Sequence, residues 1–189
     1  MPKRPRVVAD AGPLMALAKL NVLPLLKRLY GVVLVSQTVY DEVVTEGLAR
    51  GYPDAGVVQR FWAQQQWKLQ GVKAEEIPQD LQQAGLDPGE RESLFLVLRE
   101  KSALLLVDEE AGRAAARERG VRVKGTLGVL VEAFQKGIVD FEELELLFSQ
   151  IAQRDDIWIS AELCRRVLAG IRKEHRGRRG EKKPRGRRT

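Results

Sequence analysis

Two aspartates in this chain stand directly after short apolar runs. Asp10 follows Val7-Val8-Ala9, and Asp108 follows Leu104-Leu105-Leu106-Val107. In open sheets of parallel strands, ligands bind outside the carboxyl ends of the strands. If both runs are parallel strands, Asp10 and Asp108 therefore lie at the same edge of the sheet. An aspartate between a strand and a helix also often serves only as an N-cap, and this alternative stays open for Asp108.

Two glutamates are predicted to lie on or beside buried helix faces. Glu90 stands four, seven and eight residues before Leu94, Val97 and Leu98, which puts it on the inward face near the start of its helix. Glu42 borders the apolar stripe of an earlier helix. Acids on a buried face are destabilising unless they are paired or bind a metal. The alternative for each glutamate is a solvated charge at the edge of the stripe.

Four carboxylates in one site would repel and raise one another's pKa. A hard divalent cation with oxygen ligands, Mg²⁺ or Mn²⁺, relieves that repulsion. The chain has a single cysteine, Cys164, and a single histidine, His175. Cys/His zinc sites, His-dependent triads and a Cys–His dyad are therefore excluded within one chain. Metal-assisted hydrolysis of a phosphodiester is the chemistry that this composition permits.

The elements that position these acids are predicted to form an α/β domain. Uniformly apolar strands alternate with amphipathic helices, a pattern typical of a parallel sheet covered on both faces. Strands are predicted at 6–9, 32–35, 102–107 and 121–123, with a further candidate at 67–72. Helices are predicted at 13–20, 22–29, 37–46 with Ser36 as N-cap, 54–65, 87–101, 109–119, 126–137, 141–152 and 160–172.

Positive charge is concentrated at the C-terminal end of the chain. Residues 172–189 contain ten Lys or Arg and two acids, a surplus of eight, whereas the whole chain carries +6, which leaves −2 for residues 1–171. We expect residues 1–171 to form one domain and residues 172–189 a disordered basic tail. Such a tail either attracts phosphate or only keeps the protein soluble.

The sequence also predicts a cytoplasmic protein without membrane contact. No apolar run approaches the roughly 20 residues that span a bilayer. The basic residues 1–6 are followed by a short apolar run and then by Asp10, which differs from a signal peptide. A lone cysteine is suited to a reducing compartment.

Four segments resemble the motifs of PIN-domain nucleases, and they contain the four acids. They are Val7–Leu14, Val35–Val43, Leu86–Glu92 and Leu105–Asp108. The Gly89-Glu90 form of the third motif is similar to that of a prokaryotic PIN-like subfamily long catalogued as a domain of unknown function. Residues 125–130 and 157–160 resemble the same subfamily, so that the resemblance runs from about residue 7 to residue 168.

The resemblance implies a PIN-like three-layer α/β/α fold with a central parallel sheet of four to five strands. It implies cleavage of single-stranded RNA with Mg²⁺ or Mn²⁺, and the role of toxin in a toxin–antitoxin pair, as a homodimer with an antitoxin partner. Mapped onto this sequence, the catalytic and metal-binding acids are Asp10, Glu42, Glu90 and Asp108.

The sequence departs from the common PIN pattern at three motif positions. Ala11-Gly12 stands where many PIN nucleases have Ser or Thr, Glu90 stands in place of Asp, and Val107 precedes Asp108 where a hydroxyl residue is common. These changes are expected to remove hydrogen bonds that orient metal ligands. The alternative function is therefore a catalytically weak or inactive PIN-like module that binds RNA.

Two further residues are candidates for substrate binding. The hydroxyl of Thr126 stands at a predicted helix N-terminus, where phosphate can bind, although we favour an ordinary N-cap. Arg113 follows Asp108 by about one helical turn and could meet a phosphate, although we favour a solvated helix face.

A phosphatase of the haloacid dehalogenase type is a second alternative. It requires another Asp two residues after the nucleophilic Asp, where this chain has Gly12. The chain also has no GxxxxGK[ST] segment, which argues against a P-loop nucleotide site.

Overall fold

The structure is a computed structural model that describes residues 6–101 and 104–181, with side chains described to residue 174. The chain divides into two compact units, residues 1–140 and residues 141–189. This division falls inside the segment 1–171 that the sequence suggests as one domain, and the boundary at residue 171 stays a prediction.

A parallel sheet of four strands forms the centre of the first unit, in the order β2-β1-β3-β4. Val7 pairs with both Val33 and Leu104, so the middle strands start in register. The strands are short because the buried apolar runs are short, and they are β1 (Val7–Ala9), β2 (Val33–Leu34), β3 (Leu104–Leu106) and β4 (Val123–Lys124). The four expected strands are present in the described residues, and residues 102–103 of the third lie outside them.

The fifth candidate strand is wrong. In residues 67–72 only Gln70 pairs with the sheet region, through an isolated bridge to Ser36. The Gln70 amide donates to Val35 O at 2.9 Å and its carbonyl accepts from Gln37 N at 3.1 Å. Lys68, Gln70 and Gly71 provide little apolar surface to bury, and the pairing does not extend.

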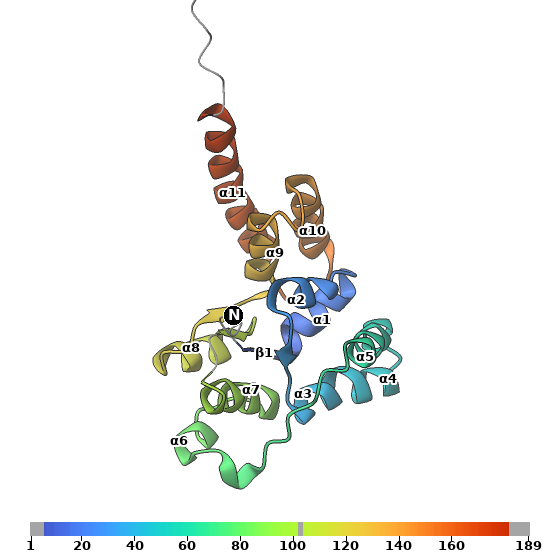
Figure 1. Cartoon of the computed structure of the whole chain (residues 1–189), viewed down its shortest axis with the longest axis vertical. Helices are drawn as coiled ribbons and strands as arrows, with labels where there is room; N and C mark the ends of the chain where they lie inside the picture. The colour runs from blue at the N-terminus through green and yellow to red at the C-terminus, as the bar shows by residue number, and fades with distance from the viewer. Residues whose placement is uncertain (1–5, 102–103, 182–189) are drawn as a thin grey trace, which may run out of the picture. The chain divides into compact units, whose positions relative to one another are not determined.

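Helices cover both faces of the sheet, which gives three layers (Figure 1). On one face α1 and α2 pack against α9, and on the other α7 packs against β1, β3 and α8. The bounds of these helices are α1 (Ala11–Lys19), α2 (Pro24–Tyr30), α9 (Thr126–Gln135), α7 (Pro88–Arg99) and α8 (Glu110–Glu118). α1 begins two residues before Pro13, because Asp10 is extended and serves as N-cap, and proline is tolerated within a first turn.

A segment of six helical elements, most of them short, connects β2 to α7. It comprises α3 (Gln37–Tyr40), the π-helix η1 (Asp41–Glu46), α4 (Gly47–Ala49), α5 (Pro53–Gln65), the 3-10 turn η2 (Ala74–Glu76) and α6 (Gln79–Gln82). The expected N-cap is confirmed, since Ser36 Oγ accepts from Val39 N at 3.1 Å. α5 packs on α1, and α3 packs on α7.

The core beneath α7 differs from the expected pattern at one position. Leu94 and Val97 are buried as predicted, but Leu98 is 37% exposed, and Leu96 is fully buried in its place. Because α7 contacts α3 and α8 as well as the sheet, it buries a wider face than a single stripe.

The second unit consists of α10 (Phe141–Gln153) and α11 (Ala161–Glu181), which pack on each other. α10 buries Leu144, Leu147, Phe148 and Ile151 at helical spacing. α11 runs nine residues beyond its expected end at Arg172, so the predicted disordered tail begins as helix, and residues 182–189 lie outside the described part. Arg, Lys and Glu are good helix formers, which explains the extension.

None of the helices within residues 6–101 and 104–181 combines the length and apolarity needed to cross a membrane.

Candidate active site

The sheet brings Asp10 and Asp108 to one edge. Asp10 continues β1, and its amide donates to Leu106 O at 3.0 Å. Asp108 follows the neighbouring strand by two residues, and a Cβ placed on Gly12 would lie 3.6 Å from Asp108 Oδ2. The first turn of α1, which Asp10 begins, therefore packs directly on the side chain of Asp108.

Asp10 is a buried carboxylate that holds a proton more tightly than usual. The residue is only 5% exposed, and Ser93 Oγ donates to Oδ1 at 3.1 Å. Burial raises the pKa of Asp10 to about 7, and the charges of Asp87 and Glu90 add to this effect. The Ala11 amide and the Ser93 hydroxyl oppose it.

Glu90 is buried on the inward face of α7, as its spacing predicts, and the alternative of a solvated charge is wrong. It forms a capping box with Asp87, in which Asp87 Oδ1 accepts from Glu90 N at 2.7 Å and Glu90 Oε2 accepts from Asp87 N at 3.2 Å. Its other oxygen, Oε1, is buried and has no hydrogen-bond partner among the described residues. Burial raises the pKa of Glu90, and the charges of Asp87 and Glu109 add to it.

Glu42 lies at the rim of this group, on η1, where much of the residue is exposed. A Cβ on Gly89 would lie 3.2 Å from Glu42 Oε2 and 3.4 Å from Asp87 Oδ1, so the absent side chain at Gly89 leaves room for both carboxylates. Partial burial raises the pKa of Glu42, and the charge of Asp87 is the next cause. π-helical turns are frequent at functional sites.

Asp108 binds Thr126 through both carboxylate oxygens. Oδ1 accepts from Thr126 N at 2.7 Å, and Oδ2 accepts from Thr126 Oγ1 at 2.6 Å. Asp108 therefore caps the N-terminus of α9, because the N-cap residue of α9, Gly125, has no side chain. It does not cap α8, whose N-cap residue is Glu109. Burial raises the pKa of Asp108, although Thr126 and Arg113 oppose the rise.

The two substrate-binding candidates both lie beside Asp108. The Thr126 side chain is fully buried and donates to Asp108, so it is not an ordinary N-cap. The Arg113 side chain is only 24% exposed, and one guanidinium nitrogen donates to Val107 O at 3.1 Å. Arg113 is thus held against the strand end, which differs from the solvated helix face that the sequence favours.

Three residues that contribute to the site were not identified from the sequence. Asp87 is a cause of the raised pKa of Asp10, Glu42 and Glu90, and Glu109 is a cause for the two glutamates. Ser93 binds Asp10. A signal existed for Ser93, because it stands three residues after Glu90 on the same helical face.

We call the six acids together the carboxylate cluster. Its members are Asp10, Glu42, Asp87, Glu90, Asp108 and Glu109. An oxygen-only donor set of this kind suits a hard divalent cation, and Glu90 Oε1, which accepts no hydrogen bond from the residues that the structure describes, could serve as a ligand atom. Among the side chains that the structure describes, however, no three Asp, Glu, His or Cys groups are arranged to hold a metal ion together.

The similarity to known families extends over nearly the whole described chain. A family model described as a PIN domain matches residues 6–173 of the 189. The chain belongs to the PIN-domain family. PIN domains are generally nucleases, and they generally use divalent metal ions. No curated protein matches the sequence at a significant level.

In this PIN domain the orienting hydroxyl groups come from outside the expected motif positions. Ala11 and Val107 provide none, but Ser93 donates to Asp10 and Thr126 donates to Asp108. The expectation that these hydrogen bonds are missing is therefore wrong. Both aspartates are held by hydroxyls from other helices, α7 and α9.

Proposed function

We propose that this PIN domain is a metal-dependent endoribonuclease that cleaves single-stranded RNA at the carboxylate cluster. The observation that carries the proposal is the placement of Asp10 and Glu90. Both are more than nine-tenths buried at the carboxyl edge of the sheet, and one Glu90 oxygen has no hydrogen-bond partner within the described part of the chain. Buried acids that repel one another destabilise the folded protein when no cation is bound, and a bound cation offsets this repulsion.

The proposed ligands of an Mg²⁺ or Mn²⁺ ion are Asp10, Glu42, Glu90 and Asp108. When bound, such an ion acts as a Lewis acid toward phosphate and activates water. Because the described side chains do not form a ready group of three ligands, ion binding requires small side-chain rotations. Glu42 is suited to this movement, since it is exposed and lies at the rim.

The remaining residues of the site position the acids and the substrate. Ser93 and Thr126 fix the carboxylates of Asp10 and Asp108 by hydrogen bonds. Arg113 lies next to Asp108 and provides a cation that can contact a phosphate at the cluster.

The biological role that we propose is that of a toxin in a toxin–antitoxin pair, acting in the cytoplasm as a homodimer silenced by an antitoxin protein. The support is the similarity of the motifs to a PIN-like subfamily and the membership of a nuclease family. Expression of the wild-type chain in a bacterial host should slow growth, and Asp10→Asn should not. Equal growth of both strains would contradict the toxin role.

The alternative function is a PIN-like module that binds RNA without cleaving it. One observation favours it, because the described acids do not form a ready three-ligand group. This alternative predicts RNA affinity that is sensitive to salt and survives removal of any of the acids.

The test is cleavage of an end-labelled single-stranded RNA with Mg²⁺, Mn²⁺ or EDTA, with duplex RNA and single-stranded DNA alongside. We compare wild type, Asp10→Asn, Glu90→Gln and the matched control Glu75→Gln, an exposed acid on η2 away from the cluster. All four proteins are purified in parallel to control for contaminating ribonuclease.

Wild type and Glu75→Gln should cleave single-stranded RNA with either metal and not with EDTA. Asp10→Asn and Glu90→Gln should lose at least roughly 100-fold in rate, since each removes a ligand charge. Equal cleavage by all four proteins would point to a contaminant. Absence of cleavage by folded wild type, with intact RNA binding, would favour the binding module.

A further inference from the structure

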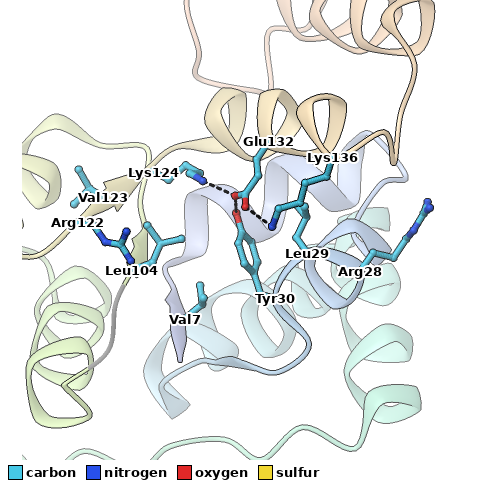
Figure 2. Close-up of a pocket in the computed structure, with 10 residues that line it drawn as sticks. All are labelled: Val7, Arg28, Leu29, Tyr30, Leu104, Arg122, Val123, Lys124, Glu132 and Lys136. Carbon is cyan, nitrogen blue, oxygen red and sulfur yellow. Dashed lines mark hydrogen bonds and ion pairs between the residues drawn. The ribbon is translucent and has the colours of Figure 1, made fainter. Parts of the chain in front are cut away.

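A second site lies in the first unit, on the face of the sheet covered by α2 and α9. It is a cavity of about 670 Å³. Its base includes Val7, Leu104 and Val123, the first residues of β1, β3 and β4 (Figure 2). The carboxylate cluster stands at the opposite, carboxyl ends of the strands. The two sites are therefore distinct.

The charges that line this cavity are mainly positive. Among the described lining residues are four cations, Arg28, Arg122, Lys124 and Lys136, and one acid, Glu132. This surplus of three positive charges contrasts with the net −2 of residues 1–171. A concave surface of one sign concentrates ligands of the opposite sign.

Glu132 organises the cationic side of the cavity. Its carboxylate accepts from Tyr30 Oη at 2.7 Å, pairs with Lys136 Nζ at 2.7 Å and binds Lys124 Nζ (Figure 2). These three hydrogen bonds outweigh the effect of burial and hold the pKa of Glu132 at about 2. The two ammonium groups therefore bind different oxygens of one carboxylate, which stays ionised.

The lysines retain hydrogen-bonding capacity for a ligand. An ammonium group has three N–H donors, and one from each lysine serves Glu132. The side chains of Lys124 and Lys136 are 28% and 50% exposed, whereas Glu132 is 17% exposed, so the cations are the more accessible groups. Figure 2 shows Arg28 and Arg122 on opposite sides of this group.

The rest of the wall is apolar. Leu104 and Val123 offer partly exposed hydrocarbon surface beside the charged group, whereas Val7 and Leu29 are buried. The cavity volume lies within the roughly 300–1,000 Å³ typical of small-molecule sites. An apolar wall next to paired cations suits a ligand that combines a flat, weakly polar ring with an anionic group.

We propose that this cavity binds a nucleotide, with its phosphate on Lys124 and Lys136 and its base against the apolar wall. The shared chemistry is a phosphate ester of nucleoside size, which exists as a free mononucleotide or as the phosphorylated end of an RNA strand. α9 connects this site to the acids, because Thr126 at its start binds Asp108 and Glu132 follows by six residues, about 9 Å along the helix.

The test is isothermal titration of the full chain with adenosine 5′-monophosphate, adenosine and inorganic phosphate, all in EDTA. The chelator removes any contribution of a metal at the carboxylate cluster, so this experiment does not depend on the nuclease proposal. Variants are Lys124→Met, Lys136→Met and Arg28→Met, with Lys27→Met as matched control, since Lys27 is an exposed cation on α2 outside the cavity. Thermal melts verify that each variant is folded.

We expect the wild-type chain to bind the monophosphate saturably. Lys124→Met and Lys136→Met should bind it at least tenfold more weakly, and Arg28→Met several-fold more weakly. Lys27→Met should bind it with unchanged affinity. Arg28→Met keeps the assignment testable if a lysine variant fails to fold, because Arg28 is exposed. Adenosine should bind at least tenfold more weakly than its monophosphate.

Three outcomes would overturn the proposal. They are absence of monophosphate binding, equal affinity in wild type and all folded variants, and equal affinity for inorganic phosphate and the monophosphate. A competition with short RNAs that carry a 5′-phosphate or a 5′-hydroxyl then identifies the source. If only the 5′-phosphorylated RNA displaces the monophosphate, the natural ligand is a strand end. If neither RNA displaces it, the natural ligand is a free nucleotide.

Discussion

At the scale of single residues, burial is the largest cause of the raised pKa of Asp10, and the neighbouring charges contribute less. An acid whose folded pKa of about 7 exceeds its unfolded value of 3.8 destabilises the protein as pH rises between those values. The destabilisation that Asp10 causes is therefore absent below pH 3.8 and is complete once the pH has risen through about 7. A bound cation would remove this penalty.

Asp10→Asn should consequently stabilise the metal-free protein at about pH 8, by roughly 1–3 kcal/mol. The amide keeps the shape of the carboxylate and an oxygen that can accept from Ser93. Urea unfolding in EDTA at about pH 8 and about pH 5 measures the difference from wild type, which should shrink at the lower pH. A variant less stable than wild type at the higher pH would contradict the assigned burial of an ionised acid.

The hydroxyls that orient the aspartates give a second prediction at this scale. Ser93→Ala and Thr126→Val each remove a donor to a proposed ligand and should weaken Mn²⁺ binding roughly 10- to 100-fold. Ser149→Ala is the matched control, since Ser149 is exposed on α10. Unchanged Mn²⁺ affinity in both variants would mean that these hydrogen bonds only support folding.

The sequence identifies some residues of the site and misses others for a physical reason. Asp10 and Asp108 stand at strand ends, and parallel strands necessarily bring their ends to one edge. Ser93 shares the inward face of α7 with Glu90, but its contact with Asp10, 83 residues away in the sequence, depends on the packing of α7, which local patterns do not encode. Glu109 joins the site through the turn before α8. Thr126 is visible as a helix start, but its partner Asp108 is 18 residues away.

At the scale of elements, Glu132 connects α9 to the end of α2 through Tyr30 and to β4 through Lys124. Its pKa of about 2 lies below the ordinary value of 4.5, so the ionised form is stabilised by folding. This contribution to stability is present above pH 4.5 and is lost as pH falls through about 2.

Glu132→Gln should lower the free energy of unfolding by roughly 1–3 kcal/mol at about pH 7, and the difference from wild type should shrink as pH falls below 4.5. Glu46→Gln is the matched control, because Glu46 pairs with Arg50 on an exposed helix face and such pairs contribute little. Urea unfolding at about pH 7, 4.5 and 3 gives the comparison. A difference that stays constant with pH would contradict the role of the ionised carboxylate.

Elements with strong local signals are those that the sequence predicts well. α7 has a capping box, Pro88 in its first turn and a clear buried face, and it begins within a residue of the expected position. Residues 67–72 alternate in a way that suggests a strand, but they find only one bridging partner. Strand pairing depends on a partner that is distant in sequence, so it is the less predictable feature.

At the scale of the whole molecule, charge is divided between residues 1–171, with a net charge of −2, and the basic residues 172–189, which begin within α11. Deletion of residues 182–189 removes five Lys or Arg and leaves α11 intact. RNA binding should weaken. The negative slope of log affinity against log salt should become shallower by roughly 0.7 for each phosphate that the shortened chain no longer neutralises.

Fluorescence anisotropy with a labelled single-stranded RNA, measured between about 50 and about 200 mM salt, gives this slope. The cleavage rate at saturating RNA should stay unchanged, because the deletion is outside the carboxylate cluster. A matched variant with the five cations changed to Gln separates charge from chain length. An unchanged salt slope in both proteins would limit the tail to a solubilising role.

Binding of a divalent ion by the carboxylate cluster is tested most directly by Mn²⁺ titration followed by electron paramagnetic resonance. Wild type and Glu75→Gln should bind Mn²⁺ saturably and with equal affinity. Asp10→Asn and Glu90→Gln should lose at least roughly tenfold in affinity, since each removes a ligand charge from an oxygen-only site. Equal Mn²⁺ affinity in all four folded proteins would contradict a metal site at the cluster and leave the buried acids without their proposed function.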